Sequence, residues 1–521
     1  MKRKFIIFIL AFPFFFGTGN AQTVRFEKYY PIRQDATPFD VKEVPGSGYL
    51  IAGFCDSIWE DSIGQIWGLE SQMLCRVDYN GDTIYTSLAR SDSSGGSGTF
   101  NWYHSLQVFN DSTFIVVGIK ENYTSQNLYD FNLIFRKYDV SGDTLWEKII
   151  SVQDTQLSFP KMIKTFDNNL IVVASMKNLY SGYRFNGLVM KMDTSGNILW
   201  RKTYTNPVHF DLRLTDVVET PDNGLMISGS DYHFTYANSN NYYPVLMKLD
   251  SAGNVVFQNI YSYYNFTTTF PITAINRTDD NNYVISCPNG NAEPAHFKFN
   301  ENGDTLWFRR ITDFNLGSMT LASTSDSNGC VVVTGCTQDS IGHFLGMLYK
   351  LDNAGSLVWK RTFTYNNDLK DVRIEAITKC SDKGFLCAGE TWCCNFVPNW
   401  GWVASLYLYK TDSLGLLVPV GVQEHPPIEN VLLSAPYPNP ATTQTTITIL
   451  VPPTNSIGMI GEKGAQLLLF DMRGRQLQKH FLHTGLNTLT IDVSSLASGE
   501  YLYVLSLDGY NAGGKKMIVQ H

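Results

Sequence analysis

Charge is scarce in this chain and carries no basic excess. Asp, Glu, Lys and Arg make up 17% of the 521 residues, and the formal net charge is −8. Ordinary soluble proteins hold roughly 25% charged residues. A nucleic-acid-binding domain needs a basic face, so this balance predicts no nucleic-acid partner. Past residue 16, no apolar run approaches the roughly 18 residues of a membrane-spanning helix, which predicts no transmembrane segment in the mature chain.

Motifs for metal or nucleophilic chemistry are missing as well. The nine histidines are scattered, with no pair at helical metal-ligand spacing, and no Gly-x-Ser-x-Gly elbow occurs. The nine cysteines are an odd number, so at least one is free or pairs between chains. Cys380 and Cys387 end two adjacent expected strands and form a candidate disulfide pair. Cys393 and Cys394 have no histidine at zinc-ligand spacing. The sequence therefore predicts neither a metal nor a cofactor.

The amino terminus has the pattern of an export signal. Lys2, Arg3 and Lys4 precede an apolar run from Phe5 to Phe16, and small residues follow up to Ala21. The run is too short to span a bilayer, and this order is typical of a signal peptide. We expect residues 1–21 to be removed by cleavage at about Ala21, the alternative being a retained anchor. Export also permits disulfides.

Seven copies of one unit fill the middle of the chain. Each holds a basic residue, then Asp or Asn, then Gly, and in six of the seven an aromatic follows, as in the segment from Lys137 to Trp146. The glycines of this motif are residues 81, 142, 196, 253, 303, 355 and 415. An apolar strand precedes each motif, ending at Gly53, Gly118, Ser175, Gly229, Cys287, Gly335 and Gly389. A further short strand comes before it, and an outer strand follows. Four strands per unit, repeated seven times, predict an all-β fold, a seven-bladed β-propeller over residues 22–420.

The two ends of the repeat array predict a closed ring. Six copies continue into an outer strand, such as 200–204, but the seventh stops at Val418-Pro419 without its aromatic. A strand of matching character lies at residues 24–30. We expect this amino-terminal strand to complete the seventh blade, which would remove the exposed strand edges of an open array.

The Asp-x-x-Gly segment of the repeat is best explained as a hairpin turn. In 78–82 it looks superficially like a calcium loop, but the alternating oxygen ligands and the distal Glu are missing. Instead Asp bonds the local backbone, Gly takes a positive φ and the aromatic packs between blades. The turn is similar to the Asp-box of sialidase-type propellers and to the tryptophan-docking repeat of quinoprotein-type propellers. It is one residue off both patterns, so neither activity carries over.

Blade topology predicts where a ligand would bind. Turns between first and second strands, and between third and fourth, are short and share one face, while the variable loops share the other. Variable loops on a rigid scaffold commonly carry recognition. Aromatics in these loops are candidate binding residues, although they also suit local packing: Trp59, Trp67, Tyr236, Tyr243, Trp392, Trp400 and Trp402. Asp40, Asp216 and Glu375 stand near strand starts, where a channel location is an alternative to solvated or turn roles.

The chain ends in a region of different pattern. After a Pro-containing linker at 421–433, residues 434–521 alternate in polarity as in a small β-sandwich. Three motifs occur in order. The first is Tyr437-Pro438-Asn439-Pro440, the second is Asp471-x-x-Gly474-Arg475, and the third includes Gly499 and Tyr501, with a terminal strand that begins at Lys515 and Lys516.

These motifs closely resemble the type A carboxyl-terminal sorting domain of the type IX secretion system of Bacteroidetes-like bacteria. The resemblance implies that the type IX machinery is a partner, and that the domain is removed with surface attachment or release. An ordinary adhesive sandwich domain is the alternative. The Pro452–Gly464 insertion is longer than the family pattern leads us to expect.

Together these features predict a secreted or cell-surface binding module. Glycan or protein recognition by the variable-loop face is the favoured function. A structural surface scaffold is the first alternative, and a propeller-type polysaccharide hydrolase or lyase is the second, which would need paired acids near the axis.

Overall fold

The computed structural model consists of two compact units, Met1–Val418 and Pro419–His521. It describes residues 25–30, 34–60, 66–89, 101–110, 112–123, 129–151, 155–178, 184–206, 211–234, 240–261, 274–287, 293–314, 318–339, 342–364, 371–397, 401–417, 432–451, 465–471, 476–507 and 510–521. The predicted signal peptide lies outside these residues, as does most of the predicted linker.

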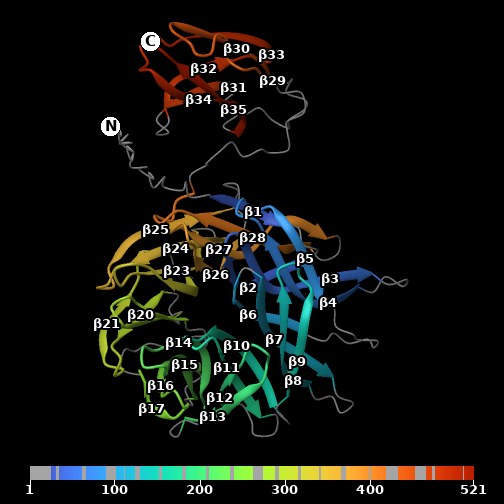
Figure 1. Cartoon of the computed structure of the whole chain (residues 1–521), viewed down its shortest axis with the longest axis vertical. Coiled ribbons are helices and arrows are strands. Elements are labelled where there is room, and N and C mark those ends of the chain that lie inside the picture. The colour runs from blue at the N-terminus through green and yellow to red at the C-terminus, as the bar shows by residue number, and fades with distance from the viewer. Residues whose placement is uncertain are drawn as a thin grey trace, which may run out of the picture. The chain divides into compact units, whose positions relative to one another are not determined.

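The described part of the first unit is all β, in seven antiparallel sets of four strands (Figure 1). Blade 1 is β2 (Gln34–Val44), β3 (Gly48–Glu60), β4 (Ile66–Val77) and β5 (Thr83–Ala89). Blade 2 is β6 (Asn101–Val108), β7 (Thr113–Tyr123), β8 (Tyr129–Asp139) and β9 (Thr144–Ile150). Blade 3 is β10 (Thr155–Lys164), β11 (Leu170–Asn178), β12 (Phe185–Met192) and β13 (Ile198–Tyr204). Blade 4 is β14 (Arg213–Glu219), β15 (Leu225–Phe234), β16 (Asn240–Leu249) and β17 (Val255–Ile260).

The remaining blades continue the pattern. Blade 5 is β18 (Ala274–Arg277), β19 (Tyr283–Cys287), β20 (Ala295–Phe299) and β21 (Thr305–Arg310). Blade 6 is β22 (Met319–Ser325), β23 (Val331–Gln338), β24 (Phe344–Leu351) and β25 (Leu357–Phe363). Blade 7 is β26 (Val372–Lys379), β27 (Phe385–Val397), β28 (Gly401–Thr411) and, as its outer strand, β1 (Phe26–Tyr30). A single parallel pairing, Gln156 with Phe131, links blades 2 and 3 into one continuous sheet.

The blades close into a ring, as the sequence predicted. The first strand of every blade contacts the preceding blade, and β2 of blade 1 contacts β26, β27 and β28 of blade 7. β1 pairs antiparallel with β28, with Phe26 opposite Lys410. Among the described residues, the buried apolar side chains form seven clusters in this unit, each between two neighbouring blades. The hydrophobic core is therefore divided among the blade junctions.

One contact recurs at the blade junctions and explains the motif. The glycine of each Asp turn packs against the outer-strand aromatic of the preceding blade, so Gly196 lies under Trp146 and Gly253 under Trp200. Gly81 of blade 1 lies under Phe26 instead. The amino-terminal strand thus supplies the aromatic that the seventh copy lacks, and the junction between blades 7 and 1 matches the others.

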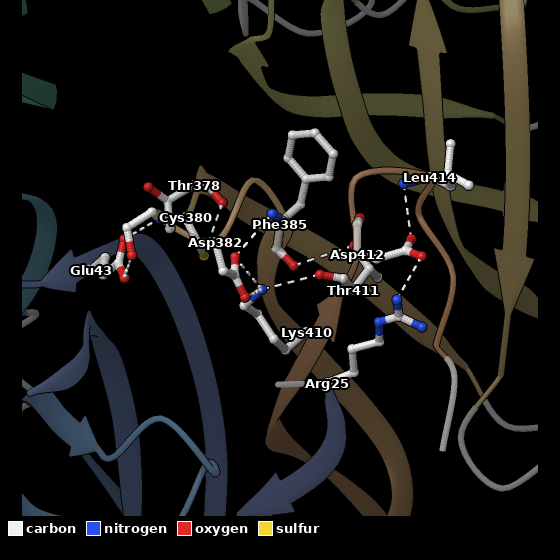
Figure 2. A network of polar contacts seen from close by, with 12 residues as sticks. Arg25, Glu43, Thr378, Cys380, Asp382, Phe385, Lys410, Thr411, Asp412 and Leu414 are labelled. Carbon is white, nitrogen blue, oxygen red and sulfur yellow. Dashed lines mark hydrogen bonds and ion pairs between the residues drawn. The ribbon is translucent and has the colours of Figure 1, made fainter. Parts of the chain in front are cut away.

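Polar contacts reinforce the same junction. Arg25 pairs with Asp412 of the seventh copy at 2.9 Å, and Glu43 at the end of β2 accepts hydrogen bonds from the Ser381 amide and hydroxyl, both at 2.6 Å. Figure 2 shows Arg25, Asp412 and Glu43 around the fully buried Lys410, whose ammonium lies 2.9 Å from Asp382. In blades 3 to 7 the lysine of the motif pairs with an aspartate of the turn between the first and second strands. This pair ties two turns of one blade together.

Glycines in the second strands allow a bulge in the first. In β2, β6, β14, β22 and β26 the register shifts opposite Gly53, Gly118, Gly229, Gly335 and Gly389. A Cβ at Gly335 would overlap the Met319 carbonyl oxygen, and Gly389 stands in the same relation to Arg373. The small residue at this repeat position is therefore needed for close approach of the bulged strand.

The second unit is a small sandwich of two antiparallel sheets, as predicted. One sheet has the order β29 (Leu432–Leu433), β30 (Gln444–Val451) and β33 (Gly485–Asp492). The other has the order β32 (Gln476–Leu482), β31 (Ala465–Asp471), β34 (Gly499–Leu507) and β35 (Tyr510–Val519). Ile447, Leu467, Tyr503 and Met517 share one buried cluster from both sheets.

The predicted Cys380–Cys387 disulfide is wrong. Both thiols are free and buried. Cys380 packs between blades 7 and 1, whereas Cys387 packs between blades 6 and 7, so the two side chains lie on opposite faces of one blade. Burial raises the pKa of Cys380 to about 12, so this thiol stays protonated and unreactive at neutral pH.

Candidate functional site in the central channel

The ring surrounds a cavity of about 390 Å³ lined by the first strands of the blades. Each of these strands starts near the side of the propeller that holds the second-to-third-strand hairpins, here called the loop side. Each ends at the short turn that follows it, on the turn side. The bulged residues project into the cavity near the starts of the strands: Phe39, His104, Phe159, Thr215, Leu321 and Glu375. Bulges re-aim side chains, and here they line a channel.

Aromatic rings gather at one wall of this channel, where Phe39, His104 and Phe159 line the cavity and Phe54 and Trp102 pack beside Phe39. Phe39 stacks on the His104 imidazole with ring centroids 4.8 Å apart, and Phe54 stacks on Trp102 at 5.3 Å. The Phe159 ring meets His104 edge-on at 6.2 Å. These five residues, from blades 1, 2 and 3, are called the aromatic wall below. Its members were not among the candidate residues taken from the sequence.

Phe159 has an unusual backbone. Its φ is +52°, in the left-handed region that bulky residues avoid, and its side chain is 45% exposed. Phe159 and Pro160 are the two extra residues of β10 at the register shift against β11, which lies between Ser158 and Lys161. Strained backbone of this kind persists only where the surrounding structure enforces it, and such positions cluster at functional sites.

Asp40 and Asp216 line the channel but are engaged in holding the blades together. Asp40 accepts hydrogen bonds from the Leu106 amide at 3.0 Å and from Lys42 at 2.7 Å. Asp216 accepts one from the Ile275 amide of the next blade at 3.0 Å. Their placement corrects the solvated or turn roles that the sequence favoured. Lys161 and Lys42 lower the pKa of Asp40 against the effect of burial, so this carboxylate is ionised.

Glu375 also lines the channel, and it differs from these two acids. Burial, with the neighbouring Glu390 carboxyl adding to it, raises the pKa of Glu375 to about 8. Glu390 itself accepts a hydrogen bond from Thr37 at 2.5 Å. No described residue donates a hydrogen bond to the Glu375 carboxyl in this structure. At neutral pH Glu375 is therefore mostly a protonated, uncharged acid.

The turn-side end of the channel opens into a second cavity, of about 700 Å³. Charged groups line it, and they are paired. Asp326 contacts Lys350 at 2.7 Å and Lys379 at 2.8 Å, and Glu219 accepts the Phe166 amide at 2.6 Å. This end of the channel is polar and internally satisfied.

The predicted binding residues fall on three hairpins of the loop side. Trp59 and Trp67 are register partners near the end of β3–β4, and Trp402 pairs with Phe396 in β27–β28, the hairpin that also holds Trp392. They lie in extended strands, whereas the sequence analysis placed them in loops. The half-buried Tyr243 pairs with Asp231 in β15–β16. Tyr236 and Trp400 lie outside the described residues.

The sorting motifs come together at the terminal strand of the second unit. The Asn439 side chain accepts the Ile518 amide at 2.8 Å, and Ala441 pairs beside Val519, so the Tyr437–Pro440 segment is fixed to β35. Tyr501 is buried and lies between Asp471 of β31 and Met517 of β35.

Exposed side chains surround these fixed points. Tyr437 is 82% exposed and Pro438 is exposed beside it. Lys515 and Lys516 are exposed too, and Lys516 contacts Glu500 at 3.2 Å. Gly499 begins β34. Gly474 and Arg475 lie outside the described residues.

Comparisons with known proteins identify this second unit. Residues 435–520 match the secretion system C-terminal sorting domain, which implies handling by the type IX secretion machinery and export to the cell surface or secretion. No curated protein sequence matches the chain. None of the described residues forms a helix with the length and apolar character needed to cross a membrane.

Solved structures similar to the chain include enzymes and uncharacterised proteins. NanB sialidase from Streptococcus pneumoniae, in a mutant form, aligns with a TM-score of 0.43 and 8% identity, covering 74% of this chain and 93% of its own. An α-L-arabinofuranosidase from Fusarium graminearum aligns with a TM-score of 0.38 and 10% identity, covering 74% and 96%. A Bacteroides caccae protein of unknown function aligns with a TM-score of 0.36 and 9% identity, covering 65% and 97%. These similarities are too low to carry an argument about activity.

Proposed function

We propose that the propeller is an exported recognition module that binds a glycan on its loop side. The supporting observation is the aromatic wall near the starts of the first strands, where Phe159 remains exposed in a strained backbone. Aromatic faces stack on the apolar faces of sugar rings and lose little conformational entropy in doing so. We also expect the tryptophans predicted from the sequence, among them Trp59, Trp67 and Trp402 of the loop-side hairpins, to take part in binding.

The export half of the proposal follows from the two ends of the chain. Residues 1–21 would direct the chain across the inner membrane and be cleaved at about Ala21. The sorting unit would then present Tyr437 and the exposed Lys515 and Lys516 to the secretion machinery. The propeller would thus reach its ligand at the cell surface or in the medium.

A glycan array and polysaccharide pull-down with the full-length purified chain tests the proposal. We expect binding to at least one glycan, weakened at least tenfold in Trp402→Ala. Phe481→Ala is the matched control, because Phe481 is a 74% exposed aromatic of the sorting unit. Equal loss in both variants, or no glycan bound by the wild type, would contradict glycan recognition. In the second case a protein partner becomes the better explanation of the loop side.

A further inference from the structure

The channel holds a buried imidazole with an unused hydrogen-bonding atom. His104 is only 8% exposed, and its Nε2 has no hydrogen-bond partner among the described residues. Phe39 stacks on one face of the imidazole and Phe159 meets it edge-on. An unpaired buried polar atom destabilises a folded protein, so its retention calls for a compensating role.

The imidazole is uncharged. Burial and the nearby Lys161 ammonium lower the pKa of His104 to about 3, so it remains neutral at any physiological pH. A neutral imidazole accepts one hydrogen bond and donates another. A hydroxyl, which can both donate and accept, can therefore complete its hydrogen bonding.

A second unpartnered polar group lies on the same level of the channel. Glu375 is the bulged residue of β26, and Phe39 is the bulged residue of β2 in the adjoining blade. Around the ring, the order at this level is the Glu375 carboxyl, the Phe39 ring, the His104 imidazole and the Phe159 ring. Because Glu375 keeps its proton at neutral pH, it too offers hydrogen bonds without charge.

The ionised groups of the channel are already paired with each other. Asp40 contacts Lys42 at 2.7 Å and Lys161 at 3.9 Å. An acidic ligand would have to compete with Asp40 for these ammonium groups, and a cationic ligand would be repelled by them. A cavity of about 390 Å³ with an aromatic wall lies within the size range of small-ligand sites.

From these contacts we propose that the channel binds one neutral sugar ring at the level of the bulges, with the ring face on Phe159 and hydroxyls bonded to the His104 imidazole and to Glu375. The site deepens the proposed function, on which it rests, and it makes the terminal residue of the glycan the part that is recognised. Unacetylated amino sugars would be repelled by the Lys42 and Lys161 ammonium groups, and uronic acids would have to displace Asp40 from them.

Saturation-transfer NMR on the full-length chain tests this site with single sugars. The probes are glucose, galactose, mannose and N-acetylglucosamine, with glucuronic acid and glucosamine as charged counterparts. We expect at least one neutral sugar to bind, and each charged counterpart to bind at least tenfold more weakly. His104→Phe keeps the stacking but removes Nε2, and Phe159→Ala removes the platform. Each should weaken binding at least tenfold.

Phe166→Ala is the control variant for these measurements. Phe166 is a 61% exposed phenylalanine of the turn side, and it lies in blade 3 as Phe159 does. Thermal melting verifies that each variant is folded. Preference for a charged sugar, or unchanged affinity in both channel variants, would overturn the inference. If the glycan array is positive while these variants leave its binding unchanged, the recognition module stands and the channel site fails. If no neutral sugar binds the wild type, the channel site fails as well.

Discussion

The two ends of the central channel differ in how their polar groups are paired. On the turn side, carboxylates pair with lysines or accept turn amides, as Asp326 does with Lys350 and Lys379. At the level of the bulges, His104 Nε2 has no partner among the described residues, and Phe159 is held at a positive φ. Both ends are built from the same seven first strands. The difference teaches that the turn side maintains the ring, whereas the bulges leave hydrogen-bonding capacity for something else.

The largest effect is expected where the bulge itself is removed. Gly335→Ala places a Cβ against the Met319 carbonyl oxygen, so β22 must move and the junction with blade 5 must loosen. We expect a loss of about 3 kcal/mol or more in the free energy of unfolding, measured by urea titration. Gly342→Ala is the control, because it has open space around it and only its φ of +93° opposes the change. A smaller loss at Gly335 than at Gly342 would refute the role given to this glycine.

Breaking an ion pair on the turn side should lower the free energy of unfolding slightly less than Gly335→Ala does. Lys410→Met removes the buried ammonium and leaves Asp382 without its partner. We expect a loss of about 2–3 kcal/mol in the free energy of unfolding in the same titration. This is less than the loss from breaking a fully buried pair, because the Asp382 side chain is 21% exposed. Lys516→Met is the matched control, since its pair with Glu500 is exposed and should contribute little. Equal effects of the two substitutions would contradict the view that the turn side depends on its ion pairs.

The pH dependence of stability tests whether Glu375, at the level of the bulges, is held in its protonated form. Its folded pKa of about 8 lies above the ordinary value of 4.5, so the folded state binds the proton more tightly than the unfolded state. Its contribution to stability is complete below about pH 4.5 and is lost as the pH rises through 8. Glu375→Gln keeps the shape of the protonated acid and should be about 1–3 kcal/mol more stable than the wild type at pH 9, with little difference at pH 4.5.

Thermal melting at a series of pH values measures this difference. The charged and titratable neighbours that act on Glu375 are Arg373 on its own strand and Glu390 on β27. Cys336 on β23 also lies near it and carries a thiol with a raised pKa. A glutamine variant that gains nothing between pH 4.5 and 9 would contradict the protonated state of Glu375.

The smallest effect is expected at His104. His104→Phe removes an unpaired buried nitrogen and keeps an aromatic ring against Phe39, so stability should change by less than about 1 kcal/mol. Ser105→Ala, in contrast, removes a hydroxyl that hydrogen bonds to Asp40 at 3.0 Å, and it should destabilise by about 1 kcal/mol. If His104→Phe proved the more destabilising in urea titration, the imidazole would belong to the structural network after all.

The repeat motif allowed the ring and its closure to be predicted, because the signals are local. Each Asp turn is encoded within ten residues, and the missing aromatic after Gly415 pointed to a strand elsewhere. The small residues at Gly53 and Gly335 were visible too, but their purpose depends on a neighbouring strand that bulges toward them. Sequence spacing does not reveal such a bulge.

The channel residues were harder to predict for the same reason. Phe39, His104 and Phe159 belong to no common motif, and they meet only because three bulges on three blades face one axis. Glu375 was considered from the sequence, but its raised pKa arises from burial by other blades. The tryptophans of the loop side stand out in the sequence, but they do not point to the channel, and their role in binding stays a prediction.

The placement of β1 has a consequence for the order of assembly. Glu27 meets Tyr407 across 380 residues, so the first described strand to be synthesised is the last to find its partner. Until residues 401–411 follow, blade 1 lacks the aromatic over Gly81 and blade 7 has an unpaired edge. Pairing so distant in sequence is slow to form. A chain crossing a membrane amino terminus first would thus stay open through most of its passage and lock only when nearly all of it has arrived. Closure of the ring therefore requires that the whole propeller has crossed the membrane.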